Sequence, residues 1–398
     1  MRTVVISDLH LSAGRDGDLL RAEGARERLW EAIEDADRVV LLGDVVELRD
    51  RPIADAIELA APFLGELRSV LPDAELLLVA GNHDHRFAED WLEARALESS
   101  EPLGLEHRAA PSGVLERLTA KAGVELELVY PGLWLREDVY ATHGHYLDRH
   151  LTVPTFERLG LAAVERVLGF PPGGPDPLDP PDGPATSPEE YEQLGSPVYA
   201  LLYELAQSGT GARRGAASPS ARIWALVGGG DTRAARMRGW LLGSVAVPGA
   251  VGAANRLGLG PVRSDLSARG ITEAGLEAMR EVVARLRIGA DHVIFGHTHR
   301  RGPLGEESGW RTTAGTRLWN TGSWVHLPTV LGRAASESPY WPGTVAVLGD
   351  AGPPHLEHVL DDLDRDDLAE LRPDGGRGAE RVSESQIPPE TTLPGEPI

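Results

Sequence analysis

An α/β fold interrupted by a mainly helical insert is predicted for this chain of 398 residues, and three observations support it. Short apolar runs alternate with amphipathic stretches through residues 3–80, which is typical of βαβ units around a sheet. The alternation stops over residues 150–290, where a Pro/Gly-rich segment separates helical patterns. The run DHVIF at residues 291–295 then resumes the first pattern, so we expect the two outer parts to form one core.

The first part of the chain contains three apolar runs typical of buried strands. The predicted order is strand 3–7, helix 22–35, strand 38–42, helix 53–70 and strand 75–80. Beyond residue 110 the pattern changes to a helix and a meander, with the helix near 112–122 and strands at 125–129, 133–136 and 139–142.

The later part divides into an insert, the second half of the core and a tail. Within the insert, the stretch PPGGPDPLDPPDGPATS at 171–187 is a loop by composition. The predicted helices span 152–168, 188–207 and 273–287, and the predicted strands span 291–295, 317–321, 324–330 and 343–348. We therefore assign residues 1–150 and 288–360 to one core, 151–287 to a helical insert or cap, and 361–398 to an acidic tail expected to be disordered.

Composition limits the chemistry that the chain can carry. The absence of cysteine excludes disulfides, thiolate metal sites and a cysteine nucleophile, so any metal must have oxygen and nitrogen ligands. The formal net charge is -22, and an acidic surface repels nucleic acid, so a general DNA or RNA binder is not expected. The amino terminus lacks the apolar run of a signal peptide, and we expect a cytoplasmic protein.

Five short polar clusters follow predicted strands directly. They are Ser7-Asp8-Leu9-His10, Gly43-Asp44-Val45-Val46-Glu47, Gly81-Asn82-His83-Asp84, Thr142-His143-Gly144-His145 and Gly296-His297-Thr298-His299. In open α/β sheets ligands bind beyond the carboxyl ends of the strands, so we expect the clusters to share one site. The candidate metal ligands are Asp8, His10, Asp44, Asn82, His143, His297 and His299.

The residue types and their spacing indicate a metal centre. The residues of the pairs Asp8-x-His10 and His297-x-His299 are two apart, and in an extended chain such residues point to the same side. Carboxylate, imidazole and amide ligands suit Mn, Fe or Zn better than Ca or Mg. Asp44 is the best candidate to bridge two ions, because a carboxylate has two anionic oxygens. Two such ions can clamp both ends of an in-line displacement at phosphorus.

Two further residues of the third cluster have predicted catalytic roles. His83 is expected near the leaving oxygen, where it can donate a proton or stabilise charge. Asp84 is predicted to orient His83. In the fourth cluster, His145 is interpreted as a substrate contact or as a residue behind the ligands.

The five clusters, in this order, resemble the motifs DxH, GDxx(D/E), GNH(D/E), a lone His and GHxH of the calcineurin-like metallophosphoesterase superfamily. The resemblance covers roughly residues 1–150 and 290–348 and implies a β-sandwich flanked by helices, with His83 as the catalytic histidine. It also implies the ligands of two ions, namely Asp8, His10, Asp44 and His299 for one and Asp44, Asn82, His143 and His297 for the other.

Further details resemble one branch of that superfamily. Glu47 stands where many members have Asp, and ISDLHLS at the start and NTGSW at 320–324 are similar to the branch that includes UDP-2,3-diacylglucosamine hydrolase. That enzyme cleaves a pyrophosphate bond in a lipid-linked nucleotide. The insert here is longer than its cap, and the tail is extra. Because of these departures, the substrate of that enzyme is not transferred to this chain. The candidates are a phosphomonoester, a phosphodiester or a pyrophosphate, with a lipid-linked or nucleotide compound as one possibility.

The insert allows two interpretations. Residues 213–238 hold six arginines against one acid, beside the apolar, Gly-rich stretch 239–262. One interpretation is a helical hairpin packed on the core with solvated arginines. The other is a cap that binds an anionic, partly apolar substrate or a membrane surface through 213–262. In that case Arg233 and Arg236 are substrate contacts, because guanidinium groups bind phosphate in a bidentate way.

Two alternative functions remain open at the level of the sequence. One is a nuclease of the same superfamily, for which the arginines of the insert would supply a local groove despite the net charge of -22. The other is a scaffold that binds metal without catalysis. No protein partner is indicated by the sequence.

Overall fold

The computed structural model describes residues 1–13, 17–173, 185–207, 247–263, 268–305, 308–327, 331, 334–335 and 338–371. Its strands are β1 (Thr3–Ile6), β2 (Arg38–Leu42), β3 (Glu75–Val79), β4 (Glu106–Ala109), β5 (Glu127–Arg136), β6 (Val139–Thr142), β7 (His292–Phe295), β8 (Arg301–Gly302), β9 (Arg317–Thr321), β10 (Thr344–Leu348) and β11 (His355–His358). Its α-helices are α1 (Glu23–Ile33), α2 (Ile53–Val70), α3 (Arg86–Glu98), α4 (Gly113–Ala122), α5 (Phe156–Leu168), α6 (Pro188–Gln207), α9 (Val247–Arg256), α10 (Ala268–Arg285) and α11 (Arg365–Glu370). Short 3-10 helices are η1 (Leu19–Arg21), η2 (His145–His150) and η4 (Ser308–Trp310).

The strands form two sheets that are joined through β5. The strand order is β11-β10-β1-β2-β3-β5-β6-β7-β9-β8. Strand β4 lies outside this order and pairs with β5 in the antiparallel direction. The first half of β5 runs parallel to β3, whereas its second half, from Gly132 onward, is antiparallel to β6. Strands β1, β2 and β3 are parallel to one another, and so are β6, β7 and β9.

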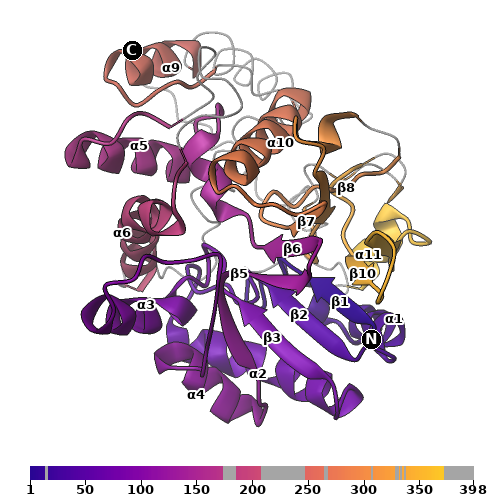
Figure 1. The fold of residues 1–398 in the computed structure, drawn as a ribbon. Coiled ribbons are helices and arrows are strands. Elements are labelled where there is room, and N and C mark those ends of the chain that lie inside the picture. The colour runs from indigo at the N-terminus through magenta and orange to yellow at the C-terminus, as the bar shows by residue number, and fades with distance from the viewer. Residues whose placement is uncertain are drawn as a thin grey trace, which may run out of the picture.

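The apolar runs of the strands have both faces buried, which explains why they are continuous rather than alternating. Val5, Val40 and Val79 face the second sheet and pack in one cluster with Val139 and Ile294. Their neighbours along each strand face outward, against α1, α2 and α4. Helix α10 covers the outer face of the second sheet. Figure 1 shows these helices on opposite sides of the strands. The structure is therefore the predicted α/β sandwich flanked by helices.

The segment predicted as an insert contributes helices with different surroundings. Helices α5 and α6 pack on each other through Leu161, Leu194 and Val198. Helix α10 instead packs on β6, β7 and η2, as part of the layer that covers the second sheet. The domain boundaries predicted from composition are not tested by these contacts and stay predictions.

Three predicted segments differ from the observed structure. The predicted strands at 125–129 and 133–136 form the single strand β5, because Pro131 and Gly132 lie where it changes its partner rather than where it ends. The predicted strand at 324–330 is absent from residues 324–327, where Val325 forms one isolated bridge with Asp18. Residues 361–371 of the predicted tail include α11, whose Leu368 is buried in the main core.

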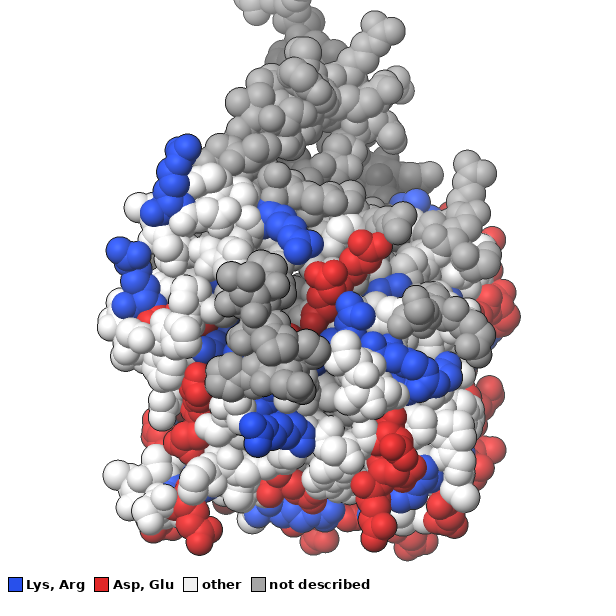
Figure 2. All heavy atoms as spheres, turned by 45° about the horizontal axis from the view of Figure 1, so that its top comes forward, with Lys and Arg blue, Asp and Glu red and all other residues white. Residues whose placement is uncertain are grey.

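The described surface carries charges of both signs. Figure 2 shows acidic and basic side chains interspersed on one face, so the net charge of -22 makes no uniform acidic patch on the described residues of that face. Among the helices in the described ranges, none combines the length and apolarity needed to cross a membrane.

Candidate metal centre

Five loops from the two sheets meet at one place. The loops after β1, β2 and β3 supply Asp8, His10, Asp44 and Asn82 from the first sheet, and those after β6 and β7 supply His143, His297 and His299 from the second. Parallel strands end at the same sheet edge, so their following residues are neighbours. The structure thereby brings together all seven residues predicted as metal ligands.

One group of donor atoms is formed by Asp8, His10 and His299. The Nε2 atoms of His10 and His299 lie 3.2 Å apart, and His299 Nε2 lies 3.3 Å from Asp8 Oδ1. Asp44 Oδ2 lies 3.6 Å from His10 Nε2. Two imidazole nitrogens at this separation repel through their lone pairs unless a proton or a cation lies between them.

The second group shares Asp44 with the first. Asp44 Oδ2 lies 3.4 Å from His143 Nε2, and Asn82 Oδ1 lies 3.3 Å from that nitrogen and 3.0 Å from His297 Nδ1. The donor atoms of Asp44, His143 and His297 all lie within 4.8 Å of one another. Oxygen and nitrogen donors that converge in this way fit transition-metal ions, and Asp44 Oδ2 lies at the junction of both groups.

The backbone of the ligand loops is strained. The φ angles are positive at Asp8 (53°), His10 (45°), Asp44 (51°), His297 (65°) and His299 (56°). Residues other than glycine rarely adopt this conformation, which costs on the order of 1–3 kcal/mol each and clusters at functional sites. The concentration of strain at five candidate ligands is therefore an independent sign that this place has a function.

Close backbone approach requires glycine at two positions of the site. A Cβ atom on Gly81 would lie 2.3 Å from Asp44 Oδ1 and 2.6 Å from the Asp44 backbone nitrogen. Gly43 has a φ of 83°, and a Cβ there would lie 2.3 Å from the ring of His143. The glycines that precede Asp44 and Asn82 therefore allow their loops to approach each other.

Three of the four candidate ligand rings, those of His10, His143 and His297, are oriented by a contact at the nitrogen that lies outside the donor group. His143 Nδ1 donates to the carbonyl oxygen of Leu42 at 3.0 Å, and His10 Nδ1 lies 3.1 Å from Glu47 Oε2. His297 Nε2 lies 2.9 Å from Asp148 Oδ1. Such contacts select the tautomer that leaves the inner nitrogen free to bind a metal.

Buried carboxylates and histidines shift one another's pKa values at the site. Burial lowers the pKa of His10, but the hydrogen bond to Glu47 and the charges of Asp44 and Asp8 raise it to about 9. Burial raises the pKa of Asp44, but the charges of His143 and His83 hold it well below its usual range. Negative charge buried here is therefore compensated by positive charge, which a metal ion also supplies.

The role of Glu47 was not recognised from the sequence. Its Oε2 lies 2.7 Å from His83 Nδ1, and thus orients the predicted catalytic histidine. The orienting role predicted for Asp84 is wrong, because both of its oxygens accept backbone N–H groups of Gly81, Asp44, Val45 and Val46. Asp84 instead holds the second loop against the third. The Glu at position 47, three residues after Asp44, was the available signal.

His145 lies behind His143 and outside the two donor groups. Its side chain is buried, its ring centroid lies 5.6 Å from that of His143, and its Nε2 lies 3.3 Å from Tyr130 Oη. Burial holds the pKa of His145 well below its usual range. This placement matches a residue that supports the ligands, and a contact between His145 and substrate stays a prediction.

Helix α6 is attached to the site by Glu192, which is buried. Its carboxylate accepts hydrogen bonds from the hydroxyl groups of Tyr130 and Tyr146, each at 2.6 Å, and lies 2.9 Å from His85 Nε2. His85 follows the GNHD cluster, and Tyr146 follows the THGH cluster. Glu192 therefore connects a helix of the predicted insert to two of the ligand loops, a contact between residues far apart in the sequence.

We expect Glu192→Gln to destabilise the metal-free protein by about 3 kcal/mol at pH 7. Burial raises the pKa of Glu192, but the charge and hydrogen bond of His85 lower it to about 2 from its ordinary 4.5. The magnitude is that of the hydrogen bonds to a buried charged group, which contribute about 1.5–3 kcal/mol. Because the folded-state pKa is lowered, the stabilisation is present above pH 4.5 and disappears as pH falls toward 2. Urea unfolding between pH 7 and 3.5 measures it, with the exposed Glu58→Gln as a control expected to change stability by less than about 1 kcal/mol. A pH-independent difference would contradict this account.

The NTGSW segment supports the loop after β7. Asn320 donates through Nδ2 to the carbonyl oxygen of Gly296 at 2.9 Å and to Thr298 Oγ1 at 3.0 Å. Its own Oδ1 accepts the N–H group of Gly322. Asn320 therefore fixes the loop that carries His297 and His299, a role that the sequence did not indicate.

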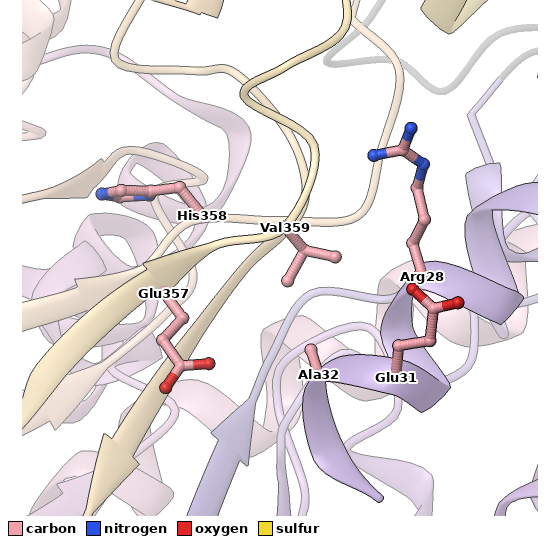
Figure 3. A pocket seen from close by; sticks show the side chains of 6 residues that line it. All are labelled: Arg28, Glu31, Ala32, Glu357, His358 and Val359. Atoms are coloured by element: carbon pink, nitrogen blue, oxygen red, sulfur yellow. The ribbon is translucent and has the colours of Figure 1, made fainter.

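One part of the predicted site falls outside the described residues. Arg233 and Arg236 lie outside the described residues, and so do residues 208–246 of the arginine-rich and apolar stretch. A surface pocket of about 310 Å³ lies between α1 and β11, as Figure 3 shows, and is lined by Arg28, Glu31, Ala32, Glu357, His358 and Val359. No candidate ligand lines this pocket, so we place the candidate chemistry at the converging loops.

Part of the chain matches a known protein family. Residues 1–181 match the family model described as calcineurin-like phosphoesterase. The structure of a dimetal phosphatase from Danio rerio aligns with 15% sequence identity over 89% of this chain and 98% of that chain, with a TM-score of 0.34. No curated protein sequence matches the chain. The matched residues include four candidate ligands, Asp8, Asp44, Asn82 and His143, and the family model ends before His297 and His299.

Proposed function

We propose that this protein hydrolyses phosphate esters with two divalent metal ions bridged by Asp44. The observation that carries the proposal is the position of Asp44 Oδ2, which lies 3.6 Å from His10 Nε2 in one donor group and 3.4 Å from His143 Nε2 in the other. The family match over residues 1–181 supports a metal-dependent phosphoesterase. Asp8 and His299 complete the first ligand set, and Asn82 and His297 complete the second.

Divalent ions held there would polarise phosphoryl oxygens and lower the pKa of water, as in other two-metal hydrolases. Mn, or a combination of Fe and Zn, suits the carboxylate, imidazole and amide donors. His83 supplies the proton for the leaving oxygen. Its Nδ1 is occupied by Glu47, which leaves Nε2 as the donating nitrogen. Asp84 keeps Asp44 in place through the backbone of its loop.

The class of substrate follows from the reaction at phosphorus and includes phosphomonoesters, phosphodiesters and pyrophosphates. We also propose a lipid-linked or nucleotide substrate and a peripheral membrane contact through residues 213–262. These proposals rest on the resemblance to the UDP-2,3-diacylglucosamine hydrolase branch and on the arginines of the insert. The superfamily match does not extend to that branch.

Removal and return of metal test the proposal. We expect chelator-treated protein to lose hydrolysis of p-nitrophenyl phosphate or bis(p-nitrophenyl) phosphate, and Mn, Fe or Zn to restore it with two ions bound per chain. Elemental analysis and release of p-nitrophenol measure the two quantities. Hydrolysis that persists after removal of all metal, or a reloaded protein that hydrolyses neither ester, would contradict the proposed function.

A further inference from the structure

We propose that Arg49 binds the substrate's phosphoryl group and makes the site selective for phosphomonoesters over phosphodiesters. This inference rests on the proposed function, since it assigns a substrate class to the same site. Arg49 lies in the loop after β2, five residues beyond Asp44. No cluster predicted from the sequence included it.

Two contacts place Arg49 at the candidate metal centre. Its backbone N–H donates to Glu47 Oε1 at 2.8 Å, while Glu47 Oε2 contacts both His10 and His83. Its Nη2 donates to the carbonyl oxygen of Asn82. The guanidinium group therefore lies beside the loop that supplies one candidate ligand and the candidate acid.

The guanidinium group is buried but incompletely satisfied. Its side chain is 10% exposed, and its Nε atom has no hydrogen-bond partner among the described residues. Arginine has five N–H donors, of which the contacts to Asn82 and Glu157 use two. A buried donor without a partner costs about 1–3 kcal/mol, so it indicates that a ligand or water supplies the acceptor.

A second unsatisfied group contacts a candidate ligand. Asp148 Oδ1 contacts His297, but its buried Oδ2 has no hydrogen-bond partner among the described residues. Arg49 contacts Asn82 and Asp148 contacts His297, so both unsatisfied atoms belong to side chains that adjoin residues of the second donor group.

The chemistry of phosphate esters explains what Arg49 would select. A phosphomonoester has three non-bridging oxygens, whereas a phosphodiester has two. If each ion binds one oxygen, a diester has none left, and a monoester has one left with additional negative charge. A guanidinium group is a preferred partner for such an oxygen because its fork of N–H donors matches phosphate. Arg49 therefore adds an interaction that only the monoester, or a terminal phosphate, can make.

A purely structural role for Arg49 predicts a different result. Its Nη1 pairs with Glu157 Oε1 of α5 at 3.2 Å, and its guanidinium carbon lies 5.8 Å from the ring centroid of Tyr199 on α6. If Arg49 only attached these helices to the core, removal of the Glu157 carboxylate would have the same effect as removal of the guanidinium group. Glu157→Gln therefore separates the two roles.

The experiment compares Arg49→Gln, Arg49→Lys and Glu157→Gln as metal-loaded full-length proteins. Arg26→Gln is the matched control, because Arg26 of α1 also forms an ion pair, with Glu66 of α2. The measurements are kcat/KM for p-nitrophenyl phosphate and for its bis ester, inhibition by inorganic phosphate, and the number of bound ions. We expect Arg49→Gln to lower monoester kcat/KM about 100-fold and diester kcat/KM less than about 5-fold. It should weaken phosphate inhibition at least about tenfold, because a charge-assisted pair is lost.

Arg49→Lys should restore part of the monoester activity, since it keeps the charge without the fork. Glu157→Gln and Arg26→Gln should each change both activities less than about 3-fold. Equal losses on both esters, equal effects of Arg49→Gln and Glu157→Gln, or a wild-type preference for the diester would overturn the inference. Wild-type protein that hydrolyses neither ester would overturn the proposed function instead. In that case calorimetric titration with inorganic phosphate would still test Arg49, because Arg49→Gln should bind phosphate more weakly than the wild type.

Discussion

Substitution of Asp44 by Asn is expected to lower metal-dependent hydrolysis by at least about 1,000-fold. The amide has one neutral oxygen and cannot bridge two cations, so several kcal/mol of charge stabilisation are lost. The fold should survive, because Asp44 Oδ1 accepts the N–H group of His83 at 2.8 Å and an amide oxygen accepts it equally. Measurements of kcat/KM with p-nitrophenyl phosphate and of metal content test both parts.

The matched control is Asp73→Asn, which makes the same chemical change at an exposed residue. We expect it to leave metal content and activity unchanged. If Asp44→Asn instead retained two ions and wild-type activity, Asp44 would not bridge the two ions. The assignment of both ligand sets would then be wrong.

Substitution of Gly81 by Ala is expected to give the second large effect. The added Cβ would lie 2.3 Å from Asp44 Oδ1 and 2.6 Å from the backbone nitrogen of Asp44, so the loop that carries Asp44 must move. A displacement near 1 Å at a catalytic group costs about 100-fold in rate. The free energy of unfolding should fall by about 1–3 kcal/mol, as for other overpacked sites. Enzyme kinetics and urea unfolding measure the two changes.

Gly289→Ala provides the control for Gly81→Ala. A Cβ on Gly289 meets no atom within 4 Å, so the same addition of one methyl group should change neither activity nor stability by more than about 0.5 kcal/mol. Equal, small effects of both substitutions would show that the loops after β2 and β3 do not need their close approach.

The fold was predictable to the extent that its elements carry their own pattern. Strands β1, β2 and β3 are apolar runs of four or five residues buried on both faces, and the helices between them have one apolar face. Strand β11, with the sequence HLEH, has no apolar pattern and was not predicted, because it pairs only at the edge of the sheet. Helix α3 was also missed, since it buries only Phe87 and Ala88 and its amphipathic pattern is weak.

The candidate ligands were predictable because each follows a strand directly and because their order matches a family motif. By itself the sequence therefore determined the α/β class, the seven candidate ligands and the kind of reaction they suit. Only the tertiary structure decided that Glu47 rather than Asp84 orients His83, that Glu192 attaches α6 to the ligand loops, and that Arg49 and Asp148 lie beside them. These contacts join segments that are far apart in the sequence. Arg49 and Asn82 are 33 positions apart, and His85 and Glu192 are 107 positions apart. A local sequence pattern records the periodicity of one element, whereas such contacts depend on how elements pack.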